Sequence, residues 1–152
     1  ARRMGLPWAE GVTVRAACLD LLLSAQPNPE NRFVLGLDSP VYLSEHTGIA
    51  ALGPHHVVHV AKYLAPNEGI EGVEEELEAL MRLAIPGWEK LLVAKKWRGA
   101  LPVCANMPEV GQHRPEIQIA PGLWRVGDGV GERGLLLDAS LASAAAVAEK
   151  IG

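Results

Sequence analysis

The chain of 152 residues is long enough for one domain with a hydrophobic core, and its 49% hydrophobic and 21% charged residues are ordinary for a globular protein. A net charge of −4 gives no basic surface for nucleic acid, which argues against DNA or RNA as a partner. The longest apolar runs, at 16–23 and 139–148, are shorter than the roughly 20 residues that cross a bilayer, so no membrane span is expected.

Short strands dominate the predicted elements of the first two thirds of the chain. The run at 14–24 alternates in a way that suits a strand buried on both faces, and a Pro-rich and Asn-rich break follows at 26–31. Asp38-Ser39-Pro40 separates two short apolar runs and predicts a hairpin. Strands are therefore expected at 14–24, 33–37, 41–44, 57–64 and 91–97.

Two helices complete the predicted elements. Apolar residues recur at helical spacing over 70–84, and the glutamates on the other face predict a solvated acidic side, with Pro86-Gly87 ending the helix. Prolines and polar residues over 101–121 predict a long ordered loop of the kind that covers a ligand. The final helix carries an apolar stripe made of Leu137, Leu141, Ala144, Ala148 and Ile151.

Between a strand at 123–126 and this last helix, the chain reads Gly127-Asp128 and then a glycine-rich turn. A carboxylate at the end of a strand, followed by the N–H groups of a helix N-terminus, is an arrangement that binds ligands with hydroxyl and anionic groups. The glycines at 129–134 also match G-x-G-x-x-G. The dinucleotide fingerprint needs a second parallel strand and an acidic residue about 20 positions later, so we interpret this match as coincidental and NAD binding as the weaker hypothesis.

The segments at 121–128 and 134–144 closely resemble the C-terminal FAD-binding motif of flavin-containing amine oxidases and phytoene desaturases. Other segments occur in an order that is similar to the second half of phytoene-desaturase-related oxidoreductases, namely those at 33–38, 41–46, 62–64, 86–88 and 97–102. The N-terminal G-x-G-x-x-G that seats the FAD pyrophosphate in that family has no counterpart near Ala1. The chain therefore resembles the C-terminal part of the family and is expected to be a fragment, whether cloned, proteolytic or one half of a split gene.

This resemblance implies an α+β fold with a mostly antiparallel sheet and one packed acidic helix at 1–120, the substrate-domain portion. It also implies the last strand and helix of a Rossmann-like FAD-binding fold at 121–152. Asp128 would accept hydrogen bonds from a ribityl hydroxyl of FAD, although an Asp there also caps turns. Backbone N–H groups at the start of the last helix would stabilise negative charge on the reduced flavin. The implied cofactor-binding residues are Gly127, Asp128, Gly134, Leu135, Leu136 and Leu137.

Other chemically active residues give weaker signals. His55 and His59 would share one face of a strand while His56 points away, which is a poor pattern for a metal ligand set, and no metal is expected. Ser44-Glu45-His46 lacks the G-x-S-x-G elbow of a hydrolase. His113-Arg114 would meet a phosphate or a carboxylate, or would be a solvated loop charge.

The remaining candidates are better explained as structural. Trp88, Trp97 and Trp124 are more typical of a core than of a stacking site. Cys18 and Cys104 fit no redox or zinc spacing and indicate a reducing compartment.

The sequence thus predicts a portion of a FAD-dependent oxidoreductase that would transfer hydride from an apolar or amine substrate to flavin. Val34, Leu35, Leu43 and Val58 are candidates for the wall of its substrate pocket, and no catalytic acid or base is identified. The alternative is a non-enzymatic domain, either stand-alone or from a split gene, that binds a ligand or partner and retains a relic flavin motif. On its own, the chain is expected to be inactive and to bind FAD weakly or not at all.

The expected partners follow from the same interpretation. The strand at 123–126 would pair with a second copy in a homo-oligomer, or the chain would bind the missing N-terminal half. No apolar stretch follows Arg2 and Arg3, so no secretory signal is predicted and a cytoplasmic protein is expected.

Overall fold

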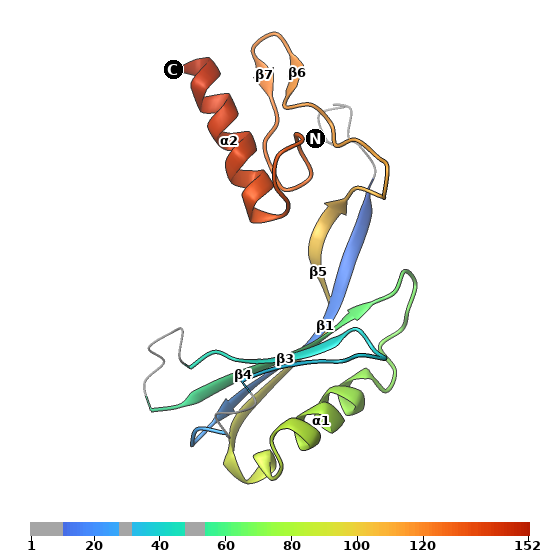
Figure 1. The fold of residues 1–152 in the computed structure, drawn as a ribbon, viewed down its shortest axis with the longest axis vertical. Helices are drawn as coiled ribbons and strands as arrows, with labels where there is room; N and C mark the ends of the chain where they lie inside the picture. The colour runs from blue at the N-terminus through green and yellow to red at the C-terminus, as the bar shows by residue number, and fades with distance from the viewer. Residues whose placement is uncertain (1–10, 28–31, 48–53) are drawn as a thin grey trace. The chain divides into compact units, whose positions relative to one another are not determined.

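The structure is a computed structural model that describes residues 11–27, 32–47 and 54–152 (Figure 1). The chain divides into two units, of which unit 2 comprises Arg15–Leu101 and unit 1 comprises Ala1–Val14 with Pro102–Gly152. Arg2, Arg3 and most of the expected break at 26–31 lie outside the described residues. The expected boundary between a substrate-domain portion at 1–120 and a FAD-binding portion at 121–152 stays a prediction.

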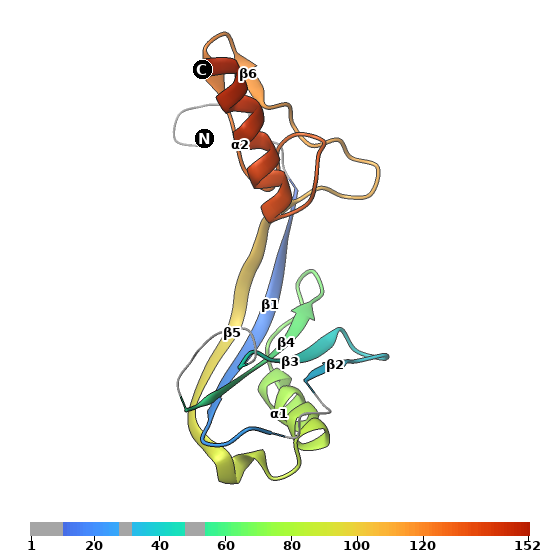
Figure 2. The ribbon, with the colours of Figure 1, turned by 60° about the vertical axis from the view of Figure 1, so that its left-hand side comes forward.

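Unit 2 is built on a five-stranded sheet with the strand order β2-β3-β4-β1-β5 (Figures 1 and 2). The strands are β1 (Val12–Leu23), β2 (Phe33–Leu35), β3 (Val41–Glu45), β4 (His56–Leu64) and β5 (Leu92–Met107). The pairs β2/β3, β3/β4 and β1/β4 are antiparallel, and the Ser24 N–H donates to the Leu91 carbonyl where β1 ends and β5 begins. The predicted α+β class with a mostly antiparallel sheet is confirmed.

One face of this sheet is covered by helix α1 (Val73–Ala84) (Figure 1). Successive side chains of a strand alternate between faces, so the odd-numbered residues of β1 from Ala17 to Leu23 all face the helix and are fully buried. Val73, Leu77, Met81 and Ala84 recur at helical spacing and fill the other side of this core, as predicted. Trp88 is buried in the same core, and Trp97 packs against it.

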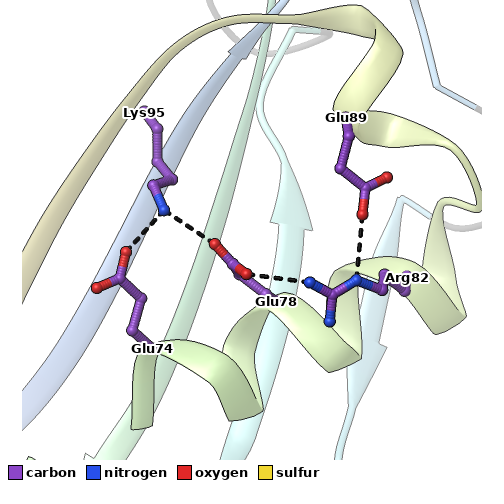
Figure 3. A network of polar contacts seen from close by, with 5 residues as sticks. All are labelled: Glu74, Glu78, Arg82, Glu89 and Lys95. Atoms are coloured by element: carbon purple, nitrogen blue, oxygen red, sulfur yellow. Dashed lines mark hydrogen bonds and ion pairs between the residues drawn. The ribbon is translucent and has the colours of Figure 1, made fainter. Parts of the chain in front are cut away.

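The acidic side of α1 is less solvated than predicted, because several of its glutamates form ion pairs (Figure 3). Lys95 of β5 contacts Glu74 at 2.8 Å and Glu78 at 2.9 Å, and Lys62 of β4 contacts Glu76 at 2.8 Å. Arg82 bridges Glu78 and Glu89, each at 3.1 Å. The charged residues of α1 therefore form ion pairs with the two strands β4 and β5, in addition to contacting solvent.

Several predicted boundaries are wrong, and the strand predicted at 33–37 already ends at Leu35. The helix begins at Val73 rather than Ile70, because Gly72 adopts a left-handed conformation with φ 75° at its N-cap. The strand β5 continues to Met107, where a loop had been predicted from Leu101 onwards. Pro102 is compatible with this strand because β5 lies at the edge of the sheet, the position in which strands tolerate proline.

Unit 1 contains the end of β5 from Pro102 onwards, a short hairpin and the last helix. Strand β6 (Gln118–Ala120) pairs antiparallel with β7 (Leu123–Trp124), and Gly122 takes a positive φ in the turn between them. The predicted strand at 123–126 is thus only two residues long and already has a partner in the chain. Helix α2 (Leu137–Ile151) follows. No helix among the described residues has the length and apolar character that crossing a membrane requires.

The apolar stripe of α2 is not covered by the rest of unit 1. The residues that α2 buries are Ala139 and Ser143. Leu137, Leu141 and Ile151 are 70%, 60% and 64% exposed. The periodicity was sufficient to predict the stripe, but within its own unit the helix packs through its small residues and leaves the stripe uncovered.

Candidate functional site

The loop that joins β7 to α2 is the site predicted from the flavin motif, and both of its ends rest on the first turns of α2. The Gly127 N–H donates to Ser143 Oγ at 3.0 Å, and the same hydroxyl lies 3.4 Å from the Gly127 carbonyl. At the other end, a Cβ on Gly134 would lie 2.7 Å from Asp138 Cβ. Asp128 and the glycines after it are therefore held beside the N-terminal half of the helix.

Glycine is required at these positions for two different reasons. Gly127 and Gly134 have φ values of 147° and 70°, which side chains rarely adopt. Gly134 is also constrained by close packing, because a Cβ atom there would lie 2.9 Å from the Asp138 carbonyl carbon and 3.0 Å from the Ala139 nitrogen. The structure thus explains Gly127 through its backbone conformation, and Gly134 through both its conformation and local packing.

Asp128, the predicted ribityl acceptor, is partly exposed. The Cys104 thiol donates to Asp128 Oδ2 at 3.6 Å, and Arg114 Nη1 donates to the Asp128 carbonyl oxygen at 3.4 Å. Arg114 therefore stabilises the loop backbone, while its neighbour His113 is exposed. The carboxylate keeps lone pairs that suit a ligand hydroxyl.

Leu135 and Leu136 directly precede α2 and Leu137 is its first residue, and their side chains are 61%, 48% and 70% exposed. The first helical hydrogen bonds are donated by Asp138 and Ala139 to the Leu135 carbonyl and by Ser140 to the Leu136 carbonyl. The N–H groups of the three leucines precede these donors, at the positive end of the helix dipole. A carboxylate, early helix N–H groups and an apolar surface are the chemistry that a flavin's ribityl chain, pyrimidine edge and ring system would need, so these residues fit that cofactor.

A small cavity of ≈ 220 Å³ lies between this loop and α2, lined by Ile117, Val130, Arg133, Ala142 and Ala146 among others. Gly131 belongs to the same wall, with a positive φ and Ile117 against it. The strand before these glycines pairs antiparallel with β6. The fingerprint match at 129–134 is therefore not seen in a parallel strand–helix–strand unit within the described residues.

A second site lies in unit 2, on the sheet face opposite α1, which we call the open face. A hollow of ≈ 550 Å³ is lined there by Asp20, Tyr42, Ser44, His46, Val57 and His59. The registers Ser44↔His59 and Asp20↔His59 place one residue from each of β3, β4 and β1 in a row across the strands. Arg98 of β5 extends this row, because its guanidinium binds the Asp20 carboxylate.

The Asp20 carboxylate is the centre of this row. His59 Nδ1 lies 2.5 Å from Asp20 Oδ1, while Arg98 binds Oδ2. Burial alone would raise the pKa of Asp20, but the hydrogen bonds from His59 and Arg98 outweigh burial and lower the pKa below its usual value. An ionised carboxylate only accepts hydrogen bonds, so Nδ1 of His59 carries the proton in this pair.

Ser44 and His46 also meet in the hollow, with Ser44 Oγ 2.8 Å from His46 Nε2. Glu45 is on the other face, where it is buried and accepts a hydrogen bond from the Thr47 N–H. The three sequence neighbours therefore do not form a triad, in agreement with the absence of the hydrolase elbow. Spacing within the sequence gave no signal for the pairing of Asp20 with His59, which are 39 positions apart.

The structure corrects the predicted pocket wall. Leu43 and Val58 are completely buried against α1, and Val34 packs against the same core, so these three do not face the open side. Leu35 does face it, at the register position of Tyr42.

The cysteines and histidines give no further site. Cys18 and Cys104 are both free and buried, and burial raises the pKa of the Cys18 thiol. In the described part of the chain, no three His, Cys, Asp or Glu side chains converge as metal ligands.

Comparison of the chain with protein-family models, with curated proteins and with solved structures finds no match in any of the three.

Proposed function

We propose that this chain forms the C-terminal part of a FAD-dependent oxidoreductase that resembles phytoene desaturases and amine oxidases. Unit 1 would contribute the final helix of a Rossmann-like FAD-binding fold, and unit 2 would contribute a sheet that faces an apolar or amine substrate. When bound, FAD would accept the hydride, and the chain's own residues would hold and orient the cofactor.

The observation that carries this proposal is the packing of the glycine-rich loop on α2. Gly127 and Gly134 anchor the loop to the helix, and this places Asp128 and the N–H groups of the first turn in one unit. The exposure of Leu135 to Leu137 leaves an apolar surface beside them. These features support a site for a ligand with hydroxyl groups at one end and an apolar ring at the other.

The test begins with the DNA upstream of the Ala1 codon, because the proposal expects the frame to continue back into a strand followed by G-x-G-x-x-G. The encoded full-length protein is then purified and its bound flavin is measured by visible absorbance. Asp128→Asn is expected to weaken FAD binding about ten- to a hundredfold, since it removes a charged hydrogen-bond acceptor. Glu132→Gln is the control, because it neutralises an exposed carboxylate in the same loop. A full-length protein without flavin, or one in which both variants behave alike, would contradict the proposal.

A second candidate function is that of a non-enzymatic domain that binds a partner chain. The outward stripe of α2, from Leu137 to Ile151, supports it, since an uncovered apolar helix face is typical of an interface. The glycine-rich half of the flavin fold, encoded separately, is the partner we propose, with a second copy of this chain as the alternative. Mixing the chain with such a half and finding neither a complex nor flavin uptake would exclude the split-gene version.

The proposed location is the cytoplasm. Both Cys18 and Cys104 are unpaired, as is usual for proteins in a reducing compartment. Fractionation of cells that produce the tagged full-length protein checks this directly.

A further inference from the structure

The open face of the sheet in unit 2 combines a hydrogen-bonding row with an apolar surface. By strand register the row runs from Ser44 on β3 through His59 to Asp20, and hydrogen bonds join His59 to Asp20 and Asp20 to Arg98 on β5. Next to it, Phe33 and Leu35 of β2 lie at the register positions of Ser44 and Tyr42, and each is 62% exposed. A ligand in the hollow would therefore meet polar atoms and apolar side chains at the same time.

The two nitrogens of His59 have different tasks. Nδ1 donates to Asp20, so in the neutral ring Nε2 is an acceptor, on the side of the ring away from that carboxylate. The rings of Tyr42 and His46 lie 5.7 Å and 6.2 Å from the His59 ring, which places them around it on the open face. Asp20 acts as a positioning residue, because it fixes which nitrogen carries the proton.

The charge balance of the row selects the ligand. The negative charge of Asp20 is matched by Arg98, which binds the other carboxylate oxygen. Because these two opposite charges lie in direct contact, the Asp20–Arg98 pair offers no net charge that would attract an anion or a cation. Beside this pair, His59 Nε2 is an acceptor near the hydroxyl of Tyr42, the Ser44–His46 pair and the apolar side chains of β2.

We propose that this hollow binds small neutral molecules that combine an apolar body with a hydroxyl or amine donor, and that His59 Nε2 accepts the donor's hydrogen. Phe33, Leu35 and Tyr42 provide the apolar contact. If the bound molecule is the substrate, this inference rests on the proposed function and restricts the substrate to one with such a donor. The binding site itself lies within unit 2, and binding there requires no flavin.

Three probes with one apolar body test the site on the isotope-labelled chain by NMR titration. Benzyl alcohol offers a donor, toluene offers neither donor nor acceptor, and acetophenone offers only an acceptor. Benzyl alcohol is expected to bind about fivefold more tightly than toluene, as one net hydrogen bond implies, and to shift the ring signals of His59. Equal binding of the two, or shifts elsewhere in the chain only, would overturn the proposal.

Two variants separate the hydrogen bond from the shape of the hollow. His59→Phe keeps a ring but removes Nε2, so it should abolish the preference for benzyl alcohol while toluene still binds. Asp20→Asn offers an N–H to Nδ1 and moves the ring proton to Nε2, so the preference should change from benzyl alcohol to acetophenone. Asp38→Asn, an exposed carboxylate in the turn before β3, is the control and should keep the original preference.

A direct spectroscopic measurement keeps the proposal testable if a variant fails to fold. Long-range nitrogen–proton correlations of the wild-type protein show which ring nitrogen of His59 is protonated when the ring is neutral. A proton on Nδ1 is expected, and a proton on Nε2 would overturn the proposal. None of these outcomes depends on FAD, so a failure here is distinguishable from a failure of the flavin proposal.

Discussion

The two α-helices among the described residues both have apolar residues at helical spacing, and they use this pattern in opposite ways. Helix α1 buries its apolar side against the sheet of unit 2 and pairs its acidic side with lysines from two strands. Helix α2 buries Ala139 and Ser143 and leaves its larger apolar residues exposed. The difference teaches that unit 2 buries its apolar residues in its own core, whereas the larger apolar residues of α2 in unit 1 stay exposed.

The largest expected effect tests the core of unit 2. Leu77→Ala removes a fully buried side chain from α1 and should lower the free energy of unfolding by about 2–5 kcal/mol, because it leaves a cavity between helix and sheet. Urea unfolding, followed by circular dichroism, measures it. A loss below about 1 kcal/mol would show that α1 is not packed as described.

The next effect tests the close packing of unit 1. Gly134→Ala forces a side chain into a left-handed conformation and against Asp138, and it should cost more than the roughly 1 kcal/mol of the conformational strain alone. Gly122→Ala is the matched control, since Gly122 has a similar φ of 75° but no heavy atom within 4 Å of the added Cβ. Equal losses of unfolding free energy in the two variants would contradict the close approach of the loop to α2.

A smaller effect tests the charged side of α1 through pH. The hydrogen bond from Lys95 lowers the pKa of Glu78, and that from Lys62 lowers the pKa of Glu76. A carboxylate whose pKa is lowered by folding stabilises the folded state above its unfolded pKa of about 4.3, and this contribution is lost as the pH falls further. Each pair should contribute about 0.2–1 kcal/mol, because both are near the surface.

The variant Lys95→Met should flatten this acid dependence. Unfolding free energies of both proteins at neutral pH and near pH 3 provide the measurement. If the unfolding free energy changes between the two pH values by the same amount in both proteins, Glu74 and Glu78 do not form ion pairs with Lys95 in solution.

The smallest effect on stability is expected on the outward face of α2. Leu141→Ser should change the unfolding free energy by no more than about 0.5 kcal/mol, since Leu141 is 60% exposed. It should nevertheless reduce self-association or binding of a partner half, measured by light scattering at increasing concentration. A chain that is monomeric at every concentration, alone and with that half, would contradict the interface.

The sequence allowed the main elements of unit 2 to be predicted because local patterns specify them. Alternation along β1 and the spacing of Leu77 and Met81 on α1 are properties of neighbouring residues. The strand at 101–107 was missed because Pro102 argues against a strand, and its edge position in the sheet, which makes Pro102 tolerable, is not encoded locally. The sequence also did not predict that the apolar stripe of α2 is exposed, since periodicity identifies the apolar residues of a helix but not what packs against them.

The candidate sites divide in the same way. Asp128 and the glycines around it could be proposed from the sequence because a contiguous motif carries them, and their role as a site stays a prediction, while the close approach of the loop to α2 accounts for Gly134. The pairing of Asp20 with His59 was missed because it depends on the register between β1 and β4, which only the folded sheet defines. Arg98 was missed for the same reason, since it reaches Asp20 from a third strand.

The side chains of β4 alternate between the two faces of the sheet, and this alternation limits which mutations the strand can tolerate. Val58 and Val60 point into the core, and His59 between them points to the open face. A slip of one residue would expose two valines and bury an imidazole, so the chain cannot lose the position of His59 without also losing its core. Insertions or deletions within β4 should therefore abolish folding, whereas replacements of His59 itself remain available for changing what the open face recognises.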